Sequence, residues 1–257
     1  AGTSAWQLTN QATSGEIEGY ASASSVNRGG SINFHISSQG QGYTLNVYRM
    51  GWYGGLGGRL MHSAGSLPGQ TRSIPVPDPE FGMAECNWPS SYTLATNASW
   101  TSGVYVARIV RGNDGKDNHV WFTLRNDAST SHILYQSAVT TFQVYNAWGG
   151  KSTYAAKSNG DPLNQGLSNA AVKVSFNRPY QPFERHGLPS NNPWVDHYLR
   201  WDCAWVRWLE SQGYDVSYST NMDTHSNGAA MLQHRVWMVG GHDEYWSNEQ
   251  MTNVMAA

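Results

Sequence analysis

The run Gly103-Val104-Tyr105-Val106-Ala107-Arg108-Ile109-Val110 decides how the first half of this 257-residue chain folds. It has the two-residue period of a β-strand and no helical stripe. Similar runs occur at 31–36 and 43–48, an apolar run at 120–124 closes the series, and Gly, Pro, Asn and Ser clusters separate them. Short strands divided by turn residues are typical of an antiparallel sandwich. We therefore predict a β-sandwich domain over residues 1–128.

The second half has a different period, in which strands alternate with helices. A predicted helix at 195–212 carries an apolar stripe and is followed by Gly213, a residue favoured just after a helix end. Ser247 and Gln250 have the spacing of a capping box. This alternation implies a largely parallel sheet covered by helices, so we predict an α/β domain over residues 129–257. The predicted strands are 132–136, 171–176, 214–218 and 236–240.

The predicted sheet has an open edge. Only four or five strands precede Ala257, so the last one leaves unpaired backbone groups. We expect either that another element covers this edge or that further chain continues the sheet. In the second case the α/β domain is truncated at Ala257.

Composition argues against several kinds of partner. The net charge is -2 and only 13% of the residues are charged, so neither nucleic acid nor an anionic membrane is expected. No apolar run approaches the ~20 residues of a membrane span. The Gly, Ser, Asn and Tyr content and the start at Ala1 predict an exported chain, extracellular or periplasmic, with a cytoplasmic location left open. Cys86 and Cys203 are expected either as one disulfide or as two free thiols.

Several enzyme classes lack their motif in this sequence. There is no Gly-x-Ser-x-Gly nucleophile elbow, no His-Glu-x-x-His, no Cys-x-x-Cys and no phosphate-binding Gly-x-x-x-x-Gly-Lys. Cys203 falls in the middle of the predicted helix among tryptophans, which is a poor environment for a thiolate nucleophile.

The stretch Gly241-His242-Asp243-Glu244-Tyr245-Trp246 directly follows a buried apolar strand. In open α/β sheets, ligands bind outside the carboxyl ends of the strands. Three adjacent ionisable residues are costly there unless they pair with one another or bind a cation. The stretch therefore predicts a functional site or, as an equal alternative, a hydrogen-bonded polar cluster that caps the next helix.

Two tyrosines have a similar predicted placement. Tyr145 lies in the segment 140–150, after the first strand of the α/β half, and Tyr180 follows the strand predicted at 171–176. Each could instead be a packing residue with a satisfied hydroxyl group, as tyrosines commonly are.

These three segments, together with Tyr48-Arg49-Met50-Gly51-Trp52-Tyr53-Gly54-Gly55, resemble the large (beta) subunit of N,N-dimethylformamidase and its broader family. The resemblance covers nearly the whole chain. It also includes the motifs at 16–22, 208–220 and 239–247.

The resemblance implies a multidomain fold, with an N-terminal antiparallel β-sandwich followed by an α/β domain similar to class I glutamine amidotransferases but without their cysteine nucleophile. In that family the α/β domain continues beyond the helix after the His-Asp-Glu motif, and the amidase works with a small second subunit. The partners it implies are a small amide substrate, a small second subunit, a C-terminal remainder of the chain, or further copies of the chain.

The resemblance also implies one mononuclear Fe(III) ion held by Tyr145, Tyr180 and Glu244, with His242 near the substrate. The position of the first ligand is open, since Tyr135 and Tyr154 lie close by in the sequence.

The implied chemistry is coherent. Hard anionic oxygen ligands suit Fe(III) better than zinc, which is commoner with nitrogen or sulfur ligands. The expected reaction is hydrolysis of a small linear amide by a water that the metal activates, with His242 and Glu244 as the catalytic residues. Two other functions stay open: a carbohydrate-binding protein that uses sandwich aromatics such as Trp52 and Trp88, and a structural subunit without turnover.

Overall fold

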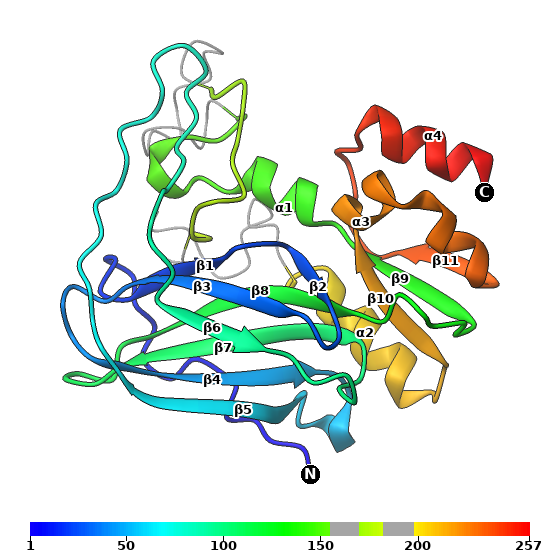
Figure 1. Cartoon of the computed structure of the whole chain (residues 1–257), viewed down its shortest axis with the longest axis horizontal. Helices are drawn as coiled ribbons and strands as arrows, with labels where there is room; N and C mark the ends of the chain where they lie inside the picture. The colour runs from blue at the N-terminus through cyan, green and yellow to red at the C-terminus, as the bar shows by residue number, and fades with distance from the viewer. Residues whose placement is uncertain (155–169, 182–197) are drawn as a thin grey trace.

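The computed structural model describes residues 1–154, 170–181 and 198–257. Its first half contains two sheets, and its second half contains a third sheet with helices around it (Figure 1). The fold is therefore β-rich with several sheets, as the sequence predicts. The boundary between residues 128 and 129 stays a prediction.

The first half is a pair of packed sheets, one with the strand order β1-β3-β6 and one with the order β2-β8-β7-β4-β5. Side chains from both sheets, among them Phe34, Leu45, Ile109 and Phe122, share one core because each strand turns alternate residues inward. The pairing is antiparallel except between β2 and β8, which run parallel. The strands are β1 Glu18–Ala21, β2 Ser25–Asn27, β3 Ser31–Ser37, β4 Tyr43–Met50, β5 Gly58–Leu67, β6 Tyr92–Ala95, β7 Gly103–Arg111 and β8 Asp117–Arg125, with a short 3-10 helix η1 at Tyr53–Gly55.

The second half is built around strand β9 (Ile133–Ser137), which pairs in parallel with β10 (Val216–Thr220) on one edge and with β11 (Val236–Val239) on the other. All five residues of β9 are buried. Both edges of β9 are therefore occupied, and the carboxyl ends of the three strands meet at one edge of the sheet. The helical segments are α1 Val139–Tyr145, η2 Trp148–Gly150, α2 Asp202–Ser211, α3 Asn221–Ser226, η5 Gly228–Gln233 and α4 Asn248–Ala256.

Two predicted elements differ from the structure. The helix predicted at 195–212 is described from Asp202 to Ser211, and residues 195–197 lie outside the described part of the chain. Its end is as predicted, since Gly213 has a φ of 76°, a left-handed conformation that glycine adopts without a side-chain clash.

The strand predicted at 171–176 is wrong, because none of these residues forms a strand or pairs with β9, β10 or β11. That segment runs instead along the long loop between β5 and β6, where the Val172 amide donates to Phe81 and the Cys86 amide donates to Asn177. In Figure 1 the cyan loop rises beside the yellow-green segment that leads to Tyr180.

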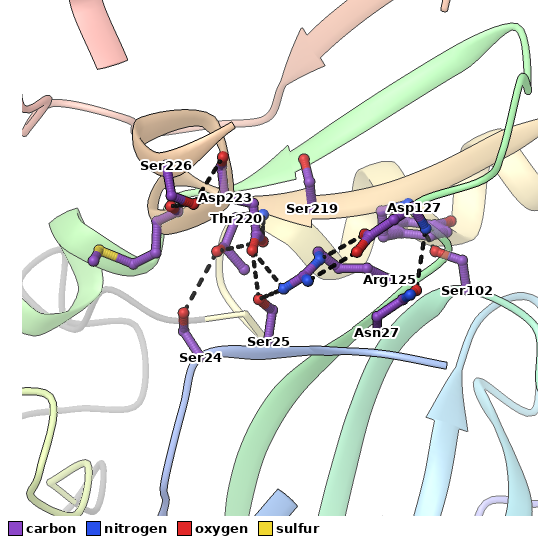
Figure 2. Close-up of polar contacts among 12 residues, drawn as sticks. Ser24, Ser25, Asn27, Ser102, Arg125, Asp127, Ser219, Thr220, Asp223 and Ser226 are labelled. Atoms are coloured by element: carbon purple, nitrogen blue, oxygen red, sulfur yellow. Dashed lines mark hydrogen bonds and ion pairs between the residues drawn. The ribbon is translucent and has the colours of Figure 1, made fainter. Parts of the chain in front are cut away.

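Charged pairs join the two halves. Arg49 of β4 reaches Glu210 of α2 at 2.7 Å, with the arginine almost fully buried. Figure 2 shows a second contact, in which Arg125 of β8 lies against Asp223 of α3 at 2.7 Å while Ser25 donates to the same carboxylate oxygen at 2.7 Å. Partly buried pairs of this kind contribute more to orientation than exposed ones, because solvent screens them less.

A buried carboxyl lies in the core of the second half. Asp202, the first residue of α2, is fully buried, accepts a hydrogen bond from the Tyr135 hydroxyl at 2.9 Å and is also bonded by the Ser137 hydroxyl. Burial away from a cation raises the pKa of Asp202 to about 7.

We predict that this carboxyl makes the protein less stable as the pH rises. The folded state keeps the Asp202 proton up to about pH 7, whereas the unfolded chain releases it near its ordinary pKa of 3.8, so unfolding becomes easier between these values. From pH 4 to pH 8, the free energy of unfolding should therefore fall by roughly 2–4 kcal/mol more in the wild type than in Asp202→Asn. Urea unfolding at both pH values tests this, and parallel pH curves for the two proteins would contradict it.

Candidate functional site

Helix α1 organises the segment that follows β11. Thr141 of α1 is fully buried, and its hydroxyl oxygen accepts hydrogen bonds from the backbone amides of Glu244 at 2.9 Å and Tyr245 at 3.2 Å. The Thr140 hydroxyl donates to the Tyr245 carbonyl at 2.6 Å. These bonds satisfy buried backbone groups and fix the loop after β11 against the helix that ends at Tyr145.

Three of the four predicted site residues come together. The Tyr145 hydroxyl donates to Glu244 Oε2 at 2.7 Å, and His242 Nε2 lies 3.0 Å from the same oxygen. The His242 ring lies 5.3 Å from the ring of Tyr145 and 5.6 Å from that of Trp201. The side chains of His242 and Glu244 are 34% and 42% exposed, so the cluster is accessible to a small molecule from solvent.

Two further tyrosines extend this cluster. The Tyr154 hydroxyl donates to the Tyr145 hydroxyl at 2.9 Å and is also paired with the hydroxyl of Tyr245. The rings of Tyr145 and Tyr154 stack with centroids 4.6 Å apart. Burial, followed by the hydrogen bonds with Tyr154 and Glu244, raises the pKa of Tyr145, so its phenol keeps its proton at neutral pH without a cation beside it.

Tyr180, the fourth predicted residue, lies next to the cluster and not in it. It packs against the small core cluster of Ala138, Val139 and Phe142, and burial raises its pKa. Trp201 packs against the same core cluster and also faces His242. Among the described residues, no hydrogen bond joins Tyr180 to Tyr145, Glu244 or His242. Tyr180 also borders a mainly apolar cavity between the two halves, which Trp121 and Tyr198 line as well.

Asp243 belongs to a different network from its two neighbours. Its carboxylate accepts hydrogen bonds from Gln136 at 2.8 Å and Asn221 at 2.9 Å, and burial raises its pKa. The alternative prediction for this stretch, a hydrogen-bonded polar cluster, is therefore correct for Asp243. It does not describe a cap for the next helix, because the N-cap of α4 is Ser247, whose hydroxyl accepts from the Gln250 amide at 3.0 Å.

The structure distinguishes between Tyr135 and Tyr154, the two alternatives to Tyr145 as the first ligand. Tyr135 donates to Asp202 in the core and is not near the cluster, whereas Tyr154 lies in it. Sequence reasoning assigned no role to Tyr245, although it adjoins Glu244 in the motif. Cys86 and Cys203 are both free thiols, and burial raises the pKa of the Cys203 thiol, which agrees with an inert cysteine.

The cluster offers mainly oxygen ligands. Within the part of the chain that the structure describes, no three His, Cys, Asp or Glu side chains form a metal-binding group. A cation at this site would therefore depend on the phenol oxygens of Tyr145 and its tyrosine neighbours together with Glu244. Phenolate and carboxylate oxygens are hard ligands that suit a hard trivalent cation, so the donor set fits Fe(III) in its chemistry.

The described helices include none long and apolar enough to cross a membrane. No curated protein matches this chain in sequence. Among solved structures, the chain is similar to one chain described under "Structural basis of T cell specificity and activation by the bacterial superantigen toxic shock syndrome toxin-1". The identity is 17%, over 42% of this chain and 97% of that chain, and the TM-score of 0.26 is too low to carry an argument.

The comparison with protein families agrees with the resemblance that the sequence motifs carry. Residues 44–257 match the family described as "N,N-dimethylformamidase beta subunit-like, C-terminal". This match covers most of the sandwich strands and all of the α/β half, including each predicted site residue. The chain therefore belongs to the N,N-dimethylformamidase beta subunit-like family.

Proposed function

We propose that this chain is an amide hydrolase subunit that cleaves the C–N bond of a small linear amide with one Fe(III) ion. The observation that carries the proposal is the meeting of Tyr145, His242 and Glu244 at a solvent-accessible strand end, in a chain of the dimethylformamidase-like family. We also propose that the α/β half is of the glutamine amidotransferase type. The parallel order β10-β9-β11 supports this.

The proposed iron ligands are Tyr145, Tyr180 and Glu244. Tyr145 and Glu244 already share a hydrogen bond, and replacing its proton by a cation would leave two anionic oxygens facing that cation. Tyr180 and Trp201 pack against the same core cluster, and Trp201 faces His242. Bound there, the ion would supply Lewis-acid chemistry, polarising an amide carbonyl and lowering the pKa of a water molecule.

The side chains around the proposed centre have separate roles. Glu244 is positioned by Thr141 through its backbone amide, and His242 is oriented by the rings of Tyr145 and Trp201. His242 is the residue we propose to accept or relay a proton, because an imidazole ring can both accept and donate one and this side chain is partly exposed. The cavity beside Tyr180 offers apolar side chains for the substituents of a small amide.

We propose a second kind of subunit as the partner, since the family is described as beta subunit-like. We also propose that the protein is exported, which rests on its composition and low charge. The carbohydrate-binding alternative is weaker on the sandwich, because Trp88 is buried and unavailable to a ligand, whereas Trp52 is 41% exposed.

We predict that Tyr145→Phe abolishes iron binding. The change removes the phenol oxygen bonded to Glu244 and leaves the ring packing against Tyr154 in place. Wild-type protein loaded with Fe(III) should show a tyrosinate-to-iron absorption band in the visible range, and the variant should lack it. Tyr105→Phe is the matched control, since Tyr105 is a buried sandwich tyrosine whose hydroxyl donates to a backbone carbonyl at 2.7 Å. A colourless, iron-free wild type that hydrolyses no simple amide would refute the proposal.

We predict that Tyr180→Phe also removes iron, while the free energy of unfolding of the metal-free protein changes by no more than about 1–2 kcal/mol, because only a hydroxyl group is lost. Metal analysis and urea unfolding of the same preparation test this. If Tyr180→Phe keeps full iron occupancy while Tyr154→Phe loses it, Tyr154 is the second tyrosine ligand and the assignment of Tyr180 is wrong.

A further inference from the structure

Arg178 is a buried arginine whose hydrogen bonds all go to uncharged groups. It is 1% exposed, and its guanidinium donates to four backbone carbonyls and to the side-chain oxygen of Gln143. No carboxylate of the described chain lies within ion-pair distance of it. An arginine has five N–H donors, and here uncharged oxygens accept their hydrogen bonds. The positive charge of the guanidinium is not neutralised by a carboxylate of the described residues.

The carbonyls that Arg178 binds surround Tyr145 in the sequence. Nη2 donates to the Gln143 carbonyl at 2.9 Å and to the Asn146 carbonyl at 2.9 Å, on either side of the tyrosine. Nη1 donates to the carbonyls of Trp148 at 3.1 Å and Lys151 at 2.8 Å, just beyond it. The guanidinium therefore binds carbonyls at the end of α1 and just beyond it, where a cation is favourable, and it shares the Gln143 carbonyl with the Asn146 amide.

Asn146 makes the reciprocal arrangement around Tyr180. Its Nδ2 donates to the Pro179 carbonyl at 2.9 Å, and its Oδ1 accepts from the Gln181 amide at 3.0 Å. These two backbone groups lie immediately before and after Tyr180. Asn146 is 6% exposed, and the same two atoms also bond within its own segment, to Gln143 Oε1 at 3.1 Å and from the Trp148 amide at 3.1 Å.

Each tyrosine is thus held by a side chain that belongs to the segment of the other. Arg178, two residues before Tyr180, binds the chain on both sides of Tyr145, and Asn146, one residue after Tyr145, binds the chain on both sides of Tyr180. Tyr180 lies in an irregular segment without sheet pairing, so these bonds replace the hydrogen bonds that a strand would supply.

We infer that Arg178 and Asn146 form a reciprocal clamp that positions the two proposed tyrosine ligands relative to one another. Both are positioning residues, since neither reaches the reacting groups. The clamp rests on the proposed function only for its use in iron binding, because the bonds themselves exist in the metal-free chain. Lysine cannot replace Arg178, since a single ammonium group cannot span carbonyls that need a planar fork.

The test compares Arg178→Lys and Asn146→Ala with Arg49→Lys. Arg49 is the control because it is 7% exposed and also donates to a backbone carbonyl, that of Ser102, away from both tyrosines, and because a lysine there keeps the positive charge that pairs with Glu210. Hydrogen exchange of the metal-free proteins is measured over residues 139–150 and 177–181, and Fe(III) affinity is measured by competition with a chelator.

We expect Arg178→Lys and Asn146→Ala each to accelerate exchange in both segments and to weaken Fe(III) binding about tenfold or more, as loss of buried hydrogen bonds predicts. Arg49→Lys should change neither. The inference is overturned if either clamp variant loosens only its own segment, or if Arg49→Lys weakens iron binding to the same degree. A wild type without iron would refute the proposed function, whereas the exchange data from the metal-free proteins would still decide the clamp.

Discussion

The pairing of β9 on both of its edges is the constraint on which the site depends. Because β10 and β11 occupy these edges in parallel, the chain leaves all three strands at the same side of the sheet. The segment after β9 becomes α1 and ends at Tyr145, and the segment after β11 carries His242 and Glu244. Residues 171–176 do not join this sheet, so the segment that leads to Tyr180 is held by other means. It is held by the loop between β5 and β6, through Phe81 and Cys86, and by Asn146.

The sequence predicted the elements that repeat with a clear period. The sandwich strands, the end of α2 at Gly213 and the cap at Ser247 follow from local patterns, because alternation and capping depend on neighbouring residues alone. The segment 171–176 alternates like a strand, yet it forms none, because it bonds to the loop between β5 and β6, a tertiary contact that local alternation does not reveal. The parallel pairing of β2 with β8 was missed for the same reason.

The site was predictable only in part. Glu244 and His242 were identified by their position after an apolar strand, which the sequence predicted to be buried and which is only partly buried as β11. The family resemblance added Tyr145, which the structure places 2.7 Å from Glu244. The sequence could not separate Asp243 from its neighbours, because the direction of each side chain depends on the turn that starts at Gly241, where φ is 61°. Arg178 and Asn146 lie close to Tyr180 and Tyr145 in the sequence, but the sequence predicted no role for them. Their acceptors are mostly backbone carbonyls, which every residue has, so no sequence pattern identifies them.

The donors and acceptors in the hydrogen bonds around Tyr145 can be assigned, and they form one ordered chain of hydroxyl groups. Each phenol has one proton to donate. The Tyr145 proton goes to Glu244 and the Tyr154 proton goes to Tyr145, so the proton between Tyr154 and Tyr245 has to come from Tyr245. Three hydroxyl dipoles therefore point in sequence toward one carboxylate oxygen, and such chains strengthen their own members by mutual polarisation. This order holds the phenol oxygens in place at the end of α1, where Arg178 already fixes the backbone. Two sets of hydrogen bonds thus fix the orientation of Tyr145. One set joins its hydroxyl group to the neighbouring side chains, and the other joins Arg178 to the backbone carbonyls around it.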